Sequence, residues 1–266
     1  MADVYATIAD ADHELQERLA AVLERRASDC QQQGMLQAYL ADMELPDGAA
    51  VLDVGCGTGA VSRELARRPG IGQVIGVDPS PVFLVAARKL AASLPNLSFI
   101  EGDGRSLPSE NNSFDAVIFH TTLSHVPEPQ AALDEAFRVL RPGGVLAVFD
   151  GNYTTTTLAT GDFDPLQSCA DAAMASLVHD RWLIPHLPGL IRAAGFTITS
   201  QRSFGFVETT APDYMLTIVD RGADVLAASG RIGVELAAAL KAEARIRVAG
   251  GVFYGSIAYA SMVAKK

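Results

Sequence analysis

The sequence predicts an α/β protein with a mostly parallel, doubly wound sheet. From Ala49 onward, short runs rich in β-branched residues alternate with helical runs, and glycine, proline or aspartate stands at the junctions. Most of the intervening segments are long enough for the right-handed crossovers that parallel strands require. We expect strands at residues 50–55, 73–78, 97–101, 114–120 and 144–150, and helices at 59–68, 80–93 and 129–140.

Residues outside this core have less regular patterns. Residues 12–43 carry apolar side chains at helical spacing, so we expect an N-terminal helical segment at 1–44 ahead of a domain at 45–266. After Asp150, the polar stretch GNYTTTTLATGDFDP is too long for a routine connection and is a candidate substrate loop. Further expected elements are helices near 165–180 and 185–194, a strand at FTITSQRSF, a helical insertion at about 207–248 and a final strand.

Composition narrows the class of function. The chain has 266 residues, 49% of them hydrophobic, and a formal net charge of -10 without a basic stripe, which argues against nucleic acid as a partner. No long uncharged apolar run and no basic N-terminus followed by an apolar segment is present, so we expect a cytoplasmic protein without a membrane partner. The three cysteines are scattered, which predicts neither a disulfide framework nor a metal site.

The segment VLDVGCGTG ends an apolar strand and opens a helix. Its glycines, Gly55, Gly57 and Gly59, let the backbone approach a ligand closely, and the helix that follows offers free N–H groups. Asp78 ends the second predicted strand in VIGVDPS, where a carboxylate can accept hydrogen bonds from both hydroxyls of a ribose. A helix-capping role for Asp78 is compatible with this position. The two segments together predict a nucleotide or nucleoside cofactor.

Two cofactor classes fit these glycines. Gly55, Gly57 and Ala60 also satisfy the looser dinucleotide pattern, so an NAD(P)-dependent oxidoreductase remains an alternative on these residues alone. Asp103, in SFIEGDGRSLP after the third predicted strand, favours S-adenosylmethionine, because a carboxylate at that edge could accept a hydrogen bond from an adenine amine. A non-catalytic module that binds S-adenosylmethionine is a second alternative.

Four segments resemble, in order, the motifs of class I S-adenosylmethionine-dependent methyltransferases: VLDVGCGTG, VIGVDPS, IEGDGRSLP and FDAVIFHTTLSHVPEPQAALDEAFRVLRPGGVLAV. Within that class, the chain is similar to the small-molecule group that includes the ubiquinone-biosynthesis C-methyltransferase. The resemblance is close over residues 45–150 and weaker elsewhere, although the closing GSIAYASMVAKK resembles the last strand of the class. It implies a Rossmann-like, seven-stranded, mostly parallel sheet with helices on both faces, and a lid formed by the N-terminal helices and the helical insertion.

The resemblance also implies a reaction and a set of site residues. The reaction is methyl transfer from S-adenosylmethionine to a small-molecule acceptor at oxygen, nitrogen or carbon, with S-adenosylhomocysteine as the product. Asp53 would help hold the methionine amino group, Asp78 the ribose hydroxyls and Asp103 the adenine amine. The full set of cofactor-binding residues would be Asp53, Gly55, Gly57, Gly59, Asp78, Ser80, Asp103, Gly104 and His120.

The chemistry of a sulfonium methyl donor requires few catalytic groups. Proximity and alignment can supply about 7–11 kcal/mol, and a general base helps when the acceptor is a hydroxyl or an acidic carbon. His120 and His125, at the end of the fourth predicted strand, are candidate bases, and His120 is favoured because it lies nearest the expected donor. Candidate substrate contacts are Tyr39, Asp150, Tyr153, Arg181, Trp182 and His186, and the apolar residues of the insertion suit a lid or the face of a homodimer.

Overall fold

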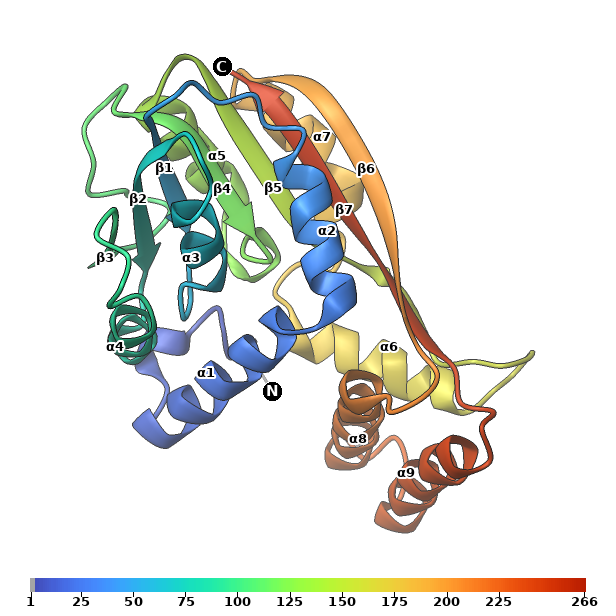
Figure 1. Ribbon diagram of the computed structural model, residues 1–266. Helices are drawn as coiled ribbons and strands as arrows, with labels where there is room; N and C mark the ends of the chain where they lie inside the picture. The colour runs from blue at the N-terminus through green and yellow to red at the C-terminus, as the bar shows by residue number, and fades with distance from the viewer. Residues whose placement is uncertain (1–2) are drawn as a thin grey trace.

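The computed structural model describes residues 3–266, which form a seven-stranded sheet of order β3-β2-β1-β4-β5-β7-β6 (Figure 1). The strands β1 to β5 are parallel, whereas β7 runs antiparallel to both of its neighbours, β5 and β6. The strand bounds are β1 Ala49–Val54, β2 Ile71–Asp78, β3 Leu97–Glu101, β4 Phe114–His120, β5 Leu140–Thr157, β6 Thr197–Glu208 and β7 Gly255–Lys265. The predicted fold class is confirmed.

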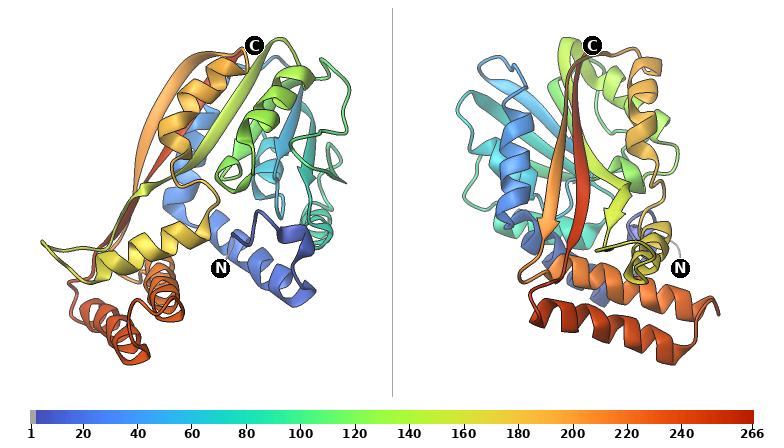
Figure 2. Two further views of the ribbon diagram at one scale, coloured as in Figure 1. Left: turned by 180° about the vertical axis from the view of Figure 1, so that it is seen from behind. Right: turned by 90° about the vertical axis from the view of Figure 1, so that its right-hand side faces the viewer.

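Helices cover both faces of the sheet (Figure 2). On one face, α2 (Cys30–Leu40) and α3 (Ala60–Ala66) pack on alternate residues of the central strands, such as Val51 and Ile118. On the other face, α5 (Pro129–Val139) and α7 (Leu183–Ala193) pack on the intervening residues, such as Leu52 and Val117. Because central strands are buried on both faces, their sequences are almost continuously apolar.

The N-terminal segment forms a short 3-10 helix, η1 (Ile8–Asp10), and then two capped α-helices. The first of these packs beside α4 (Pro81–Leu90), the helix that follows β2. Asp12 accepts a hydrogen bond from the N–H of Leu15 and begins α1 (His13–Ala27), and Asp29 caps α2 in the same way. Figure 1 shows α1 beside α4, below the ends of the parallel strands, whereas α2 runs along the sheet.

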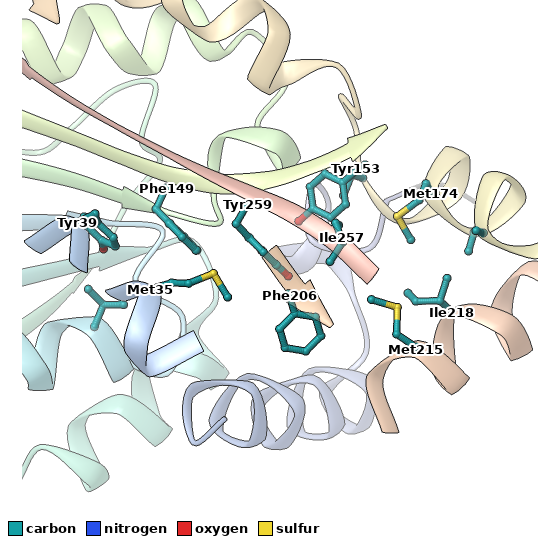
Figure 3. Close-up of a cluster of buried hydrophobic side chains, with 14 of the residues drawn as sticks. Met35, Tyr39, Phe149, Tyr153, Met174, Phe206, Met215, Ile218, Ile257 and Tyr259 are labelled. Atoms are coloured by element: carbon teal, nitrogen blue, oxygen red, sulfur yellow. The ribbon is translucent and has the colours of Figure 1, made fainter. Parts of the chain in front are cut away.

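The C-terminal half adds a helical layer of α6 (Leu166–Leu177), α8 (Asp213–Ala228) and α9 (Val234–Ala249) at one end of β5, β6 and β7 (Figure 1). An apolar cluster joins this layer to the sheet, with Tyr39 and Phe149 toward one end and Met174, Met215 and Ile218 toward the other (Figure 3). The structure therefore has one core that runs from the parallel sheet into the helical layer.

One expectation about this region was wrong. Residues 151–157, interpreted as part of a substrate loop, continue β5 instead. Gly151 and Asn152 pair with Tyr259 and Ala258 of β7, and after an irregularity Thr157 pairs with Ser256. Threonine is β-branched and suits an extended backbone, so the polarity of TTTT did not indicate a loop. The irregular connection is limited to residues 158–165.

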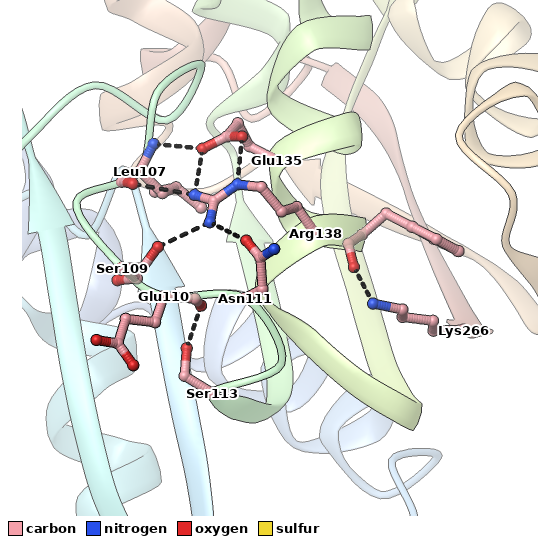
Figure 4. Close-up of polar contacts among 9 residues, drawn as sticks. Leu107, Ser109, Glu110, Asn111, Ser113, Glu135, Arg138 and Lys266 are labelled. Atoms are coloured by element: carbon pink, nitrogen blue, oxygen red, sulfur yellow. Dashed lines mark hydrogen bonds and ion pairs between the residues drawn. The ribbon is translucent and has the colours of Figure 1, made fainter.

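A salt bridge and several hydrogen bonds from α5 fix the connection between β3 and β4. Arg138 on α5 pairs with Glu135 and donates hydrogen bonds to the carbonyl oxygens of Leu107 and Ser109 and to the side chain of Asn111 (Figure 4). The N–H of Leu107 in turn donates to Glu135. These contacts anchor the segment that follows the third strand. In residues 3–266, no helix combines the length and hydropathy needed to cross a bilayer.

The crossing of α6 and α8 yields a stability prediction. A Cβ added to Gly222 on α8 would lie 1.9 Å from the carbonyl oxygen of Cys169 on α6, so Gly222→Ala must push the two helices apart. We expect a loss of about 1–3 kcal/mol in the free energy of unfolding, measured by urea denaturation. Gly34→Ala is the matched control, because no atom lies within 4 Å of that added Cβ. The control should leave stability unchanged or raise it, and equal effects of the two substitutions would contradict the prediction.

Candidate functional site

A cavity of about 890 Å³ opens at the carboxyl edge of the parallel strands. Its lining comes from the ends of β1, β2, β4 and β5, from residues 4–10 and α1, and from α8. Ligands of open α/β sheets bind at this edge, so the cavity is the candidate site. Within residues 3–266, no group of three or more histidine, cysteine or acidic side chains is placed to hold a metal ion.

The glycine segment forms one wall of the cavity. The N–H groups of Gly55 and Cys56 both donate to the carbonyl oxygen of Val77, which ties the loop to β2. Gly55 has a φ of +71°, and a Cβ there would lie 2.2 Å from Thr122, so only glycine fits. Gly55 and Gly57 line the cavity. Gly59, also expected to bind the cofactor, lies outside the lining, and its missing Cβ makes room for the ring of Phe99.

Asp78 is buried beneath this loop, with 5% of its surface exposed. Its carboxylate accepts the N–H of Gly57 at 2.8 Å and the N–H of Ser80 at 2.9 Å. Burial raises the pKa of Asp78 to about 6, and the two N–H donors limit the shift. Ser80 itself does not line the cavity, because its hydroxyl donates to Gln16 and accepts the N–H of Phe83 as the cap of α4.

Asp53 is the second buried carboxylate of the cavity wall. It is 1% exposed and accepts a hydrogen bond of 2.5 Å from the hydroxyl of Ser62. Burial raises the pKa of Asp53 to about 6; the hydroxyl of Ser62 opposes this shift and the charge of Asp78 adds to it. Neither carboxylate has an ion-pair partner among residues 3–266. The wall therefore holds two negative groups that lack a counter-charge.

The third predicted carboxylate lies at the rim. Asp103 pairs with Arg105 at 2.6 Å, its side chain is 46% exposed, and hydrogen bonding to Arg105 lowers its pKa. Gly104 lies beside it in the lining. The carboxylates of Asp53 and Asp78 thus lie at the carboxyl ends of β1 and β2, and that of Asp103 lies just after β3, and all three line a single cavity.

Helix α1 closes the cavity over the glycine loop. Glu24 accepts the hydroxyl of Thr58 at 2.6 Å and pairs with Arg63 at 2.7 Å, while Arg63 also donates to the carbonyl oxygen of Thr58. One methyl group of Leu23 lies 2.9 Å from the position of an added Cβ on Gly57. A helix remote in sequence therefore forms part of the site.

His120 ends β4 and lines the cavity. Its Nδ1 lies 3.0 Å from the hydroxyl oxygen of Tyr39, which has no other hydrogen-bond partner in the described chain. The buried hydroxyl therefore donates to Nδ1, and the ring hydrogen is on Nε2. Burial lowers the pKa of His120 to about 3, and the nearby Arg26 adds to the shift. Tyr39, expected as a substrate contact, lies behind His120 and outside the lining.

His125 has a different partner. Its Nδ1 lies 2.8 Å from a carboxylate oxygen of Asp3, which is 7% exposed and also accepts the N–H groups of Tyr5 and His179. The carboxylate holds the hydrogen on Nδ1, so Nε2 is left as an acceptor. His125 lines the cavity, and the centre of its ring lies 4.9 Å from the centre of the Tyr5 ring.

Among the expected substrate contacts, only Tyr153 lines the cavity. Asp150 is fully buried and accepts hydrogen bonds from Ser124 and Gly151, and burial raises its pKa. The other expected contacts, Arg181, Trp182 and His186, lie at or just before the start of α7, which packs on a sheet face rather than at the edge. Arg181 lies 5.6 Å over the exposed ring of Trp182.

Sequence reasoning missed several lining residues, namely Tyr5, Arg26, Thr122, Tyr214 and Arg221. Thr122 could have been found, because it follows a parallel strand at the binding edge. The others come from helices and the N-terminal segment, where an arginine in an amphipathic run cannot be distinguished from a solvated one.

The comparisons with known proteins agree with this geometry. Residues 52–148 match the family described as "Methyltransferase domain". The chain is 37% identical over 116 residues to a 2-phytyl-1,4-naphtoquinone methyltransferase of Thermosynechococcus vestitus, covering 43% of this chain and 52% of that one. It is 38% identical over 117 residues to a demethylmenaquinone methyltransferase of Staphylococcus aureus, covering 44% and 48%. The chain therefore spans about half the length of the curated relatives it matches.

Solved structures share the fold over most of the chain. A Bacillus halodurans protein aligns with a TM-score of 0.64 at 21% identity, covering 87% of this chain and 98% of that one. The [4+2]-cyclase SpnF aligns with a TM-score of 0.56 at 27% identity, covering 88% and 80%. The family match is confined to residues 52–148, the part of the chain that carries the glycine segment, Asp53, Asp78 and Asp103. Over about this core, the sequence is similar to those of quinone methyltransferases.

The geometry of His120 yields a titration prediction. With a pKa of about 3, its imidazole stays neutral throughout the physiological range, so its ring NMR signals should not shift between about pH 4.5 and 8. The unfolded chain binds this proton near pH 6.5, so His120 should remove stability as the pH falls from 6.5 toward 3. His120→Gln assigns the signals, and a titration midpoint near 6.5 would contradict the prediction.

Proposed function

We propose that the chain transfers a methyl group from S-adenosylmethionine to a small-molecule acceptor, with both molecules bound in the one cavity. The observation that carries this proposal is the row of carboxylates, Asp53, Asp78 and Asp103, at or just after the carboxyl ends of β1, β2 and β3 beside the glycine loop. An amino group, two ribose hydroxyls and an adenine amine are donors that such a row can bind in order.

The buried charges support a cationic, hydroxyl-rich ligand at this wall. Asp53 and Asp78 are nearly inaccessible, and their raised pKa values show that burial disfavours their ionised forms. An ammonium group at Asp53 and hydroxyl donors at Asp78 would supply the missing counter-charge and hydrogen bonds. At Gly55, the absence of a Cβ leaves room for the side chain of Thr122, which lines the same cavity.

The chain supplies alignment and proton transfer. S-adenosylmethionine provides a methyl group that its sulfonium already makes electrophilic. The walls formed by α1, residues 4–10 and α8 hold the acceptor in line and exclude water. His120, with its hydrogen on Nε2 and its low pKa, donates a hydrogen bond rather than accepting a proton. His125, oriented by Asp3, is the general base that the geometry supports, which reverses the preference drawn from the sequence.

An NAD(P)-dependent oxidoreductase fits the fold less well. Dinucleotide-binding folds have strand order 3-2-1-4-5-6 with parallel strands, whereas here an antiparallel β7 is inserted between β5 and β6. The likeness to a cyclase shows why methyl transfer itself has to be measured. Release of S-adenosylhomocysteine should be assayed against a panel of small phenols, enols, acids and amines. Binding of S-adenosylhomocysteine without turnover on any acceptor would support the non-catalytic alternative.

Asp78→Asn tests the donor half. Loss of the ionised acceptor should weaken binding of S-adenosylhomocysteine, measured calorimetrically at neutral pH, by about 10–100-fold. Asp134→Asn, on the exposed face of α5, is the matched control and should bind as the wild type does. Equal affinity of Asp78→Asn and the wild type, or stronger binding of NAD than of S-adenosylhomocysteine, would overturn the assignment.

The same site predicts a pH dependence. Because Asp53 and Asp78 have pKa values of about 6, lowering the pH to 5 protonates both before ligand binds. Affinity for S-adenosylhomocysteine should fall about tenfold for each carboxylate that must be ionised, relative to pH above 7. Calorimetry across this range measures the effect. An affinity that is constant from pH 7.5 to 5, within the range in which the protein stays folded, would contradict it.

His125→Gln tests the base once an acceptor with an ionisable proton is found. Turnover should fall by about 10²–10⁴-fold while affinity for S-adenosylhomocysteine is unchanged. Asp3→Asn should lower kcat in the same direction, because it removes the group that orients His125. His120→Gln should raise KM more than it lowers kcat. Wild-type turnover by His125→Gln would exclude this residue as the base.

A further inference from the structure

Two arginines in the cavity lack an ion-pair partner in the described part of the chain. Arg26 on α1 and Arg221 on α8 both line the cavity, and neither has a carboxylate within 4.0 Å among residues 3–266. The arginines that do pair with carboxylates elsewhere, in order of sequence, are Arg18, Arg63, Arg105, Arg138, Arg141, Arg202, Arg245 and Arg247.

Neutral phenols rather than acids surround Arg26. Its Nη2 donates to the hydroxyl of Tyr259 at 3.4 Å, and its guanidinium lies 5.5 Å from the centre of that ring. The hydroxyls of Tyr153 and Tyr214 lie close enough to act on its charge, whereas Asp150 acts only from beyond ion-pair distance. The charge of Arg26 is thus solvated by dipoles and a ring face, not neutralised.

Arg221 is also incompletely compensated. Within residues 3–266, its hydrogen bonds are two long contacts with Ser176, of 3.5 Å to the hydroxyl and 3.3 Å to the carbonyl oxygen. Burial lowers the pKa of Arg221, and the nearby Asp3 and Tyr5 offset this only in part. The two acids of its own helix that line the cavity are occupied elsewhere, because Asp220 pairs with Arg245 and Asp224 with Lys241.

The position of the two cations separates them from the donor wall. Asp53, Asp78 and Asp103 lie at β1, β2 and β3, whereas Arg26 contacts Tyr259 on β7, which lies beyond β4 and β5 in the order of the sheet. Arg221 lies on α8, outside the sheet. Both cations act on the hydroxyl of Tyr5, so they face one region of the cavity. The remaining lining there is apolar or aromatic, with Tyr153, Leu177, Val178, Tyr214, Ile218 and Val225.

This inference rests on the proposed function. We propose that the acceptor is a small anion with a planar, apolar body, and that its carboxylate or ionised hydroxyl is held between Arg26 and Arg221. The formal net charge of the chain is -10, yet these two cations lie unpaired at the cavity. Their local positive charge attracts an anion although the protein as a whole is negative. An acceptor anion would supply the missing charge and accept hydrogen bonds from guanidinium groups. The methionine carboxylate is a competing source of such an anion.

The test uses the full chain saturated with S-adenosylhomocysteine. The probes are salicylate and benzoate, each compared with its uncharged amide, and the readouts are calorimetry and the shift in melting temperature. Salicylate or benzoate should bind and raise the melting temperature, and each amide should bind at least tenfold more weakly. Equal binding of acids and amides, or no binding of either acid up to the millimolar range, would overturn the anionic acceptor without affecting the donor half.

Substitutions of the two arginines test which cation binds the acid. Arg26→Gln and Arg221→Gln should each weaken acid binding at least tenfold and leave affinity for S-adenosylhomocysteine within twofold. Arg26→Lys, which keeps the cation if Arg26→Gln folds poorly, should retain part of the binding. Arg25→Gln, on the exposed face of the same helix, is the matched control and should behave as the wild type. If Arg26→Gln instead weakens S-adenosylhomocysteine tenfold and leaves acid binding unchanged, Arg26 holds the methionine carboxylate and the proposal fails.

Discussion

The shared direction of the parallel strands is the constraint on which the site depends. The strand β1 lies between β2 and β4, and its last residue, Val54, is level with Val77 on one side and Phe119 on the other. The residues that follow these strands therefore meet at one edge, although they are far apart in sequence. The glycine loop, Asp78 and His120 lie together because their strands are adjacent, parallel and end at the same level.

The two sides of the cavity carry opposite charges. Uncompensated carboxylates, Asp53 and Asp78, lie on the side of β1 and β2, and uncompensated guanidinium groups lie on the side of β7 and α8. Helix α1 joins the two sides, because Glu24 binds the loop at Thr58 while Arg26, two residues on and on a different face, binds Tyr259. Buried groups without counter-charges cost stability, and bound donor and acceptor would relieve that cost.

The histidines show how far sequence could predict the site. Strand patterns placed both His120 and His125 at the correct edge, and both line the cavity. Their roles depend on partners far away in the chain, 81 residues for Tyr39 and 122 for Asp3, which set opposite tautomers. Local patterns also could not separate Gly59 and Ser80, which serve packing and capping, from Gly55 and Asp78, which face the cavity. Residues 151–157 were misassigned because β7, which pairs with them, lies a hundred residues away.

The sequence by itself determined the class of fold, the order of its core elements and the three carboxylates that line one side of the cavity. These follow from local signals: apolar runs that must be buried as strands, glycines that a tight turn requires, and acids at or just after the ends of strands. Only the tertiary structure decided which helices close the cavity, which histidine is free to accept a proton and where two cations remain unpaired. Those properties arise from side chains that meet across the fold, and their burial and charge balance exist only once the chain is packed.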